Sequence, residues 1–90
     1  METRIAAVSI IVESPDAVDP LNNILHDYNK YIIGRLGLPY RRRGISIISI
    51  IMDAPNDVIS ALSGKLGMLP NVTAKAVYSK LFPVDENNRD

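Results

Sequence analysis

The basic side chains of this sequence gather in one short segment. Three arginines are consecutive at positions 41–43, a tyrosine precedes them, and a further arginine lies at position 35. Guanidinium groups bind carboxylates and phosphates through paired hydrogen bonds, so the segment could bind either group or a nucleic-acid backbone. A solvated hairpin turn, whose charges prevent pairing between sheet edges, is the alternative. The predicted site for a small anionic ligand consists of Arg35, Tyr40, Arg41, Arg42 and Arg43.

Metal binding has weaker support in the sequence. His26 is the only histidine, the chain has no cysteine, and the further candidate ligands are Asp27, Glu13 and Asp53. One imidazole without thiolates is a poor basis for a zinc or nickel site, so we expect no bound metal and no other cofactor. The lack of cysteine also excludes disulfides and cysteine nucleophiles.

No spacing in the chain indicates a catalytic centre. Ser46 and Ser49 lie among isoleucines, as polar positions of a strand do, and no general base is placed beside them. Glu13 and Asp53 each end an expected strand, and we expect them at the same end of the sheet, where two carboxylates could act together. Helix capping is the alternative role for Asp53. We therefore expect a protein that is not an enzyme.

Four extended and two helical segments must position these residues. Glycines at positions 34, 37 and 44 suggest a bulged hairpin between the second and third strands, or a close approach of a ligand or a neighbouring subunit. The order β-α-β-β-α-β predicts an α+β, ferredoxin-like fold: a four-stranded antiparallel sheet with two helices on one face. We expect one domain over residues 1–82 and a polar tail over 83–90. The expected strands cover 4–13, 31–36, 45–53 and 72–78, the helices begin at 16–19 and 55–57, and the arginine loop covers 38–44.

Length and charge exclude several classes of protein. The 90 residues suffice for one domain, and the 10 basic and 10 acidic side chains give a net charge of zero. A general nucleic-acid-binding surface would be basic, so direct DNA binding is not expected. The apolar run near the N-terminus is shorter than the roughly 20 residues of a membrane span, and no signal-peptide cleavage site follows it. We expect a cytoplasmic protein that does not bind membranes.

The expected strands are apolar on both faces. In the third strand, Ile47 and Ile51 point one way while Ile48 and Ile50 point the other. Two helices can cover only one face, and an open apolar face usually marks an interface. Burying several hundred Å² of it would contribute on the order of 10 kcal/mol, against about 4–15 kcal/mol for association. We predict a homo-oligomer, a dimer or tetramer, that forms through the sheet.

Three stretches together resemble one small bacterial family. They are RIAAVSIIVE at 4–13, YIIGRLGLPYRRRGISIISIIMD at 31–53 and ISALSGKLGMLPNVTAKAVYSK at 59–80. They resemble the regulators of the iron-only hydrogenase system, whose fold is similar to ACT domains and to the C-terminal domain of the nickel-responsive repressor. The resemblance implies a regulatory or accessory role, with hydrogenase maturation proteins as partners.

The resemblance does not supply functional residues. The nickel repressor's site uses several histidines and a cysteine, so nickel sensing is not expected for this chain. That repressor also carries a DNA-binding segment before its regulatory domain, whereas the first strand here begins at Arg4. We predict a ligand- or protein-binding module without catalysis. The alternative is an accessory enzyme or metallochaperone in hydrogenase maturation, whose site would be shared between subunits and built from Arg35, Tyr40, Arg41, His26 or Glu13.

Overall fold

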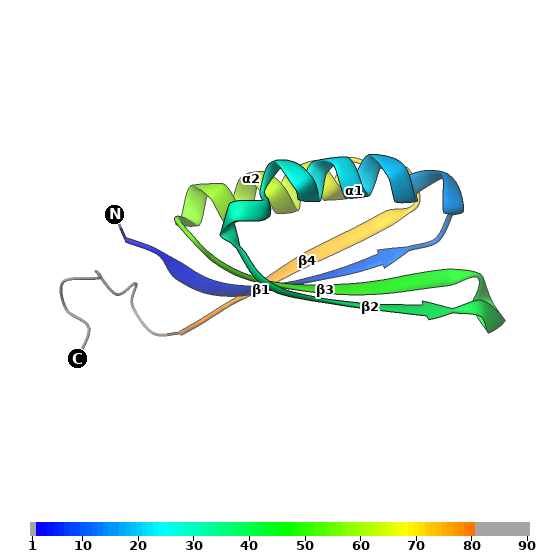
Figure 1. The fold of residues 1–90 in the computed structure, drawn as a ribbon, viewed down its shortest axis with the longest axis horizontal. Helices are drawn as coiled ribbons and strands as arrows, with labels where there is room; N and C mark the ends of the chain where they lie inside the picture. The colour runs from blue at the N-terminus through cyan, green and yellow to red at the C-terminus, as the bar shows by residue number, and fades with distance from the viewer. Residues whose placement is uncertain (1, 81–90) are drawn as a thin grey trace.

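The fold has two layers, a sheet and a pair of helices that cover one of its faces (Figure 1). The computed structural model describes residues 2–80. One four-stranded sheet has the order β2-β3-β1-β4, and every neighbouring pair is antiparallel. This arrangement confirms the predicted ferredoxin-like α+β fold. The elements are β1 (Arg4–Val12), α1 (Val18–Asp27), β2 (Ile32–Tyr40), β3 (Ile45–Ala54), α2 (Asn56–Gly67) and β4 (Val72–Tyr78), with 3₁₀ turns η1 (Pro15–Ala17), η2 (Asn29–Tyr31) and η3 (Arg41–Arg43).

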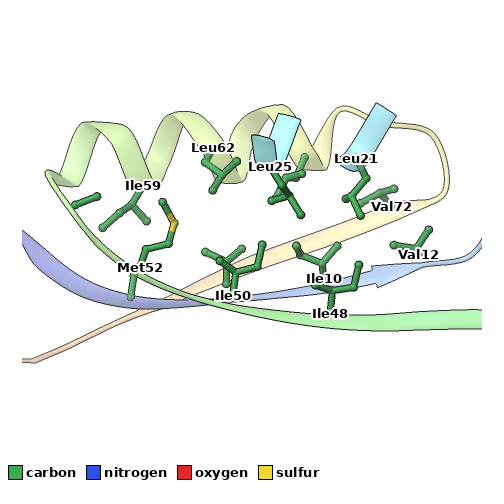
Figure 2. Close-up of a cluster of buried hydrophobic side chains, with 14 of the residues drawn as sticks. Ile10, Val12, Leu21, Leu25, Ile48, Ile50, Met52, Ile59, Leu62 and Val72 are labelled. Carbon is green, nitrogen blue, oxygen red and sulfur yellow. The ribbon is translucent and has the colours of Figure 1, made fainter. Parts of the chain in front are cut away.

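The core lies between the helices and one face of the sheet (Figure 2). Alternate residues of the central strands point toward the helices and are buried, because side chains of a strand alternate between its two faces. Ile10 of β1 and Ile50 of β3 have no exposed surface, and neither do Leu21 of α1 and Leu62 of α2. Side chains of this kind contribute about 1.5–3 kcal/mol each when fully buried. The core therefore fixes which face of each central strand remains open.

The second strand is longer than predicted. It runs to Tyr40 instead of ending at residue 36, and the connection to β3 shrinks to the turn Arg41–Arg43 and Gly44. Gly37 and Pro39 suggested a loop, but β2 is an edge strand, where proline is tolerated because one side of the backbone needs no partner. The register of β2 shifts between Ile32 and Gly34, as at a β-bulge, next to the first of the glycines that suggested an irregular hairpin.

Two further sequence-based expectations concern the C-terminal tail and the absence of a membrane span. The polar tail predicted for residues 83–90 lies outside the described residues. Neither helix of residues 2–80 is long and apolar enough to cross a membrane.

Candidate functional site

The face of the sheet opposite the helices is covered by no element of residues 2–80 (Figure 1). We call it the open face. Its large apolar side chains come from all four strands, and the exposed fraction of each lies between 37% and 69%. The strand register places these residues on one surface. They are Ile5 and Ile11 of β1, Leu36, Leu38 and Tyr40 of β2, Ile47 and Ile51 of β3, and Val77 of β4.

The open face carries few polar groups, and its positive and negative charges balance. Ser9 and Ser49 face each other on the two central strands. By strand register the charged positions of this face are Asp53 on β3 and Lys75 on β4, one acid and one base. Two copies of the face could therefore meet without an excess of like charge.

The three consecutive arginines form the exposed tip of the β2–β3 hairpin. They occupy the 3₁₀ turn η3, and Gly44 ends it in the left-handed region at φ 65°. A hollow of about 230 Å³ lies beside the tip and is lined mostly by apolar side chains. Tyr40 and Arg41 contribute to the lining, whereas Arg42 and Arg43 do not. The other lining residues are Val12, Ser14, Pro15, Val18, Pro39, Gly44, Ile45 and Ser46.

Arg35 lies apart from the hairpin tip. Its position pairs with Ile50, a core residue, so its side chain leaves β2 on the helix side of the sheet. There it lines a groove of about 260 Å³ between the first helix and the edge strand. We call this the α1–β2 groove, and its lining residues are Asn22, Leu25, His26, Asn29, Ile32 and Arg35. The five residues of the predicted ligand site are thus divided between two hollows and the exposed tip.

Asn22 is the residue of the groove that sequence reasoning missed. Its side-chain oxygen Oδ1 accepts a hydrogen bond from Nη2 of Arg35 at 2.9 Å. The signal available in the sequence is its helical spacing, because Asn22 and His26 are four residues apart and lie on the same face of α1. Asn29 lies beyond the end of α1, in the 3₁₀ turn η2, and lines the same groove.

The predicted pairing of Glu13 with Asp53 is wrong. Glu13 directly follows the end of β1, whereas Asp53 pairs with Ile5 near the beginning of that strand. The strands are antiparallel neighbours, so their carboxyl ends lie at opposite ends of the sheet. Capping by Asp53 is not observed either, since α2 has Pro55 at its N-cap and no side-chain cap bond.

The remaining candidates for metal binding and catalysis are scattered. Within residues 2–80, no three histidine, aspartate or glutamate side chains are grouped closely enough to hold a metal ion. His26 lies in the same groove as Arg35, and a guanidinium disfavours a bound cation nearby. Ser46 lines the hairpin hollow and Ser49 lies on the open face, so the two serines are on opposite sides of β3.

Comparisons with known proteins identify a family. The family model described as "TM1266-like: Iron-only hydrogenase system regulator, putative" matches residues 4–76. A solved structure, that of the uncharacterized protein TM1266 from Thermotoga maritima, is similar with a TM-score of 0.85 and 36% sequence identity, over 88% of this chain and 100% of that chain. No curated protein matches the chain. This chain belongs to the TM1266-like family.

Proposed function

We propose that this chain is a regulatory or accessory module of the iron-only hydrogenase system. It acts as a homo-oligomer, a dimer or tetramer, and binds a small ligand or a protein without catalysing a reaction. The family description supports the link to the hydrogenase system. Hydrogenase maturation proteins are the partners that this role implies.

The open face is the observation that carries the proposal. A domain of this size rarely leaves apolar residues from every strand exposed on one surface, and such a surface usually belongs to an interface. We assign a second copy of the chain as its occupant. The face is self-complementary in charge, with Asp53 balanced by Lys75, and its two serines offer hydrogen-bonding groups at the centre. An isologous two-fold dimer requires a surface of that kind.

The same geometry argues against a catalytic or metal-transfer site shared between subunits. Two of its candidate residues, His26 and Arg35, line the α1–β2 groove on the helix side of the sheet, away from the open face. Tyr40 does lie on the open face, but at its edge, opposite Ile45. The charged residues of that face are separated within one chain, because Asp53 pairs with Ile5 and Lys75 with Ser9, four positions apart along β1.

A double substitution on the open face tests the proposal. Ile47→Lys with Ile51→Lys places two charges on the assigned interface, at positions 38% and 37% exposed, where a monomer tolerates them. We expect light scattering to give a mass above the 9.9 kDa of one chain for the wild type and a mass near 9.9 kDa for the double variant. Circular dichroism of the two proteins should agree.

Two further variants complete the experiment. Asn23→Lys adds a charge on the exposed surface of α1 and should leave the oligomer intact. Ile50→Lys places the charge in the core, where Ile50 has no exposed surface, and should unfold the domain. A wild type that is a single 9.9 kDa species at micromolar concentration contradicts the proposal.

A further inference from the structure

The bulge in β2 decides on which side of the sheet Arg35 lies. Ile32 pairs with Met52, but Gly34 pairs with Ile51 and Arg35 with Ile50, so one extra residue is accommodated in β2. If β2 continued from Ile32 in regular register, with Ile33 opposite Ile51, Arg35 would pair with Ser49 and lie on the open face, because a shift of one residue exchanges the two faces of a strand. Bulges are common beside binding sites, where they redirect a side chain. Here the bulge brings a guanidinium to the helix side.

The guanidinium of Arg35 is exposed and reaches α1 through one hydrogen bond. Nη2 donates to Oδ1 of Asn22 at 2.9 Å, which links the edge strand to α1 across the groove. Arginine has five N–H donors, so this bond leaves most of them available to a ligand. Leu25 and Ile32 form the apolar part of the groove, and Asn29 adds an amide.

The charge of the groove is one-sided. Arg35 and His26 are its ionisable lining residues, and none of the lining residues is acidic. The chain as a whole is neutral, so this local excess of basic groups does not follow from composition. A hollow of about 260 Å³ with an exposed guanidinium, two amides and an apolar wall offers contacts to a small molecule that carries an anionic group.

We propose that the α1–β2 groove binds a small molecule with a carboxylate or phosphate group, through Arg35. Asn22 is a positioning residue that orients the guanidinium, and His26 is a second contact to the anion. The inference deepens the ligand-binding part of the proposed function. It is independent of the oligomer, because the groove lies on the helix side of the sheet and the assigned interface lies on the open face.

Nuclear magnetic resonance titration of the full chain tests the groove, with inorganic phosphate and succinate as probes. We expect saturable shifts of the Arg35 Nε–Hε signal and of the Asn22 and Asn29 side-chain amide signals, at millimolar concentrations for one probe or both. A phosphate response without a succinate response assigns a phosphorylated ligand, and the reverse assigns a carboxylate. Absence of saturable shifts with both probes overturns the proposal.

Substitutions locate the binding. Asn22→Asp keeps the side-chain shape but places a carboxylate against Arg35, and we expect it and Arg35→Gln to weaken the probe affinity by about tenfold or more. Arg42→Gln removes the same charge from the exposed hairpin tip and should leave the affinity unchanged. The Ile47→Lys, Ile51→Lys protein should bind the probe as the wild type does. Equal probe affinities of the Asn22→Asp protein and the wild type contradict the assignment. So does an affinity loss in the Arg42→Gln protein equal to the loss in the Arg35→Gln protein.

Discussion

Ser9 of β1 and Ser49 of β3 lie directly opposite each other in the middle of the open face. On the same face, the serine pair has one apolar pair before it and one after it along β1. These are Ala7 with Ile51 and Ile11 with Ile47. The two hydroxyls, with Lys75 of β4 on the other side of Ser9, therefore form a small polar spot on an otherwise apolar surface. In a dimer formed through this face, the spot would be shielded from water at the centre of the contact.

Placing a charge at that spot should separate the subunits. We expect Ser49→Asp to weaken self-association by about 2 kcal/mol or more, because a carboxylate is costly to desolvate at an interface centre and Lys75, the base of this face, lies two strands away. Sedimentation velocity over a dilution series measures the change. Asn23→Asp adds the same charge on the exposed surface of α1 and serves as the control. An unchanged sedimentation coefficient for Ser49→Asp would remove this face as the interface.

Ile50 and Ile47, on opposite faces of β3, should respond differently to truncation. Ile50 is fully buried, so Ile50→Ala should lower the free energy of unfolding by about 2–4 kcal/mol at every protein concentration. Ile47 is 38% exposed in one chain, so the cost of Ile47→Ala should grow with protein concentration as oligomer forms. Urea denaturation at several concentrations distinguishes the two. A concentration-independent effect of Ile47→Ala would assign it to the monomer alone.

Arg4 ties the two ends of the described chain together. Its guanidinium carbon lies 4.6 Å from the centre of the Tyr78 ring. Nη1 donates to Oδ1 of Asn56 at 3.1 Å, and Nη2 donates to the backbone oxygen of Ser79 at 2.9 Å. These contacts join β1, α2 and the residue after β4.

Loss of the guanidinium should therefore destabilise the fold. We expect Arg4→Met to lower the free energy of unfolding by about 1–2 kcal/mol, since it removes the stacking and both hydrogen bonds but keeps an apolar side chain. Arg4→Lys should recover only part of this, because an ammonium group cannot stack and donate in the same planar geometry. Chemical denaturation of the three proteins measures the order. A lysine variant as stable as the wild type would show that charge alone matters.

The sequence predicted the elements whose patterns are regular. Isoleucines that alternate between two faces made β3 unmistakable, and the bounds predicted for β4 agree with Val72–Tyr78. Edge strand β2 was misjudged at its end, because Gly37 and Pro39 are rare inside strands unless one edge of the backbone is free. The sequence pattern alone does not show that one edge of β2 has no neighbouring strand within residues 2–80.

The location of functional side chains was harder to predict for a related reason. A single extra residue in β2 decides whether Arg35 lies on the open face or beside Asn22, and no sequence period locates a bulge to one position. Glu13 and Asp53 were assigned to the same end because each ends a strand, but strand direction in the sheet decides that question. Sites formed between elements depend on register, which local propensity does not fix.

The three arginines of the hairpin tip provide the last test. All are exposed in a turn that contributes no buried residue, and Arg41 lines the hollow beside the tip. We expect the Arg41→Gln, Arg42→Gln, Arg43→Gln protein to fold with a free energy of unfolding within about 0.5 kcal/mol of the wild type. Its solubility should fall, because charge at a sheet edge limits pairing between molecules.

A pull-down with hydrogenase maturation proteins shows whether the tip also binds a partner. We expect the triple variant and the wild type to recover the same proteins in equal amounts, since the exposed turn contributes no buried residue to the fold. Arg35→Gln is the comparison, because it removes a guanidinium elsewhere on the chain and leaves the tip intact. Loss of a partner in the triple variant, with recovery retained in Arg35→Gln, would assign partner binding to the hairpin tip.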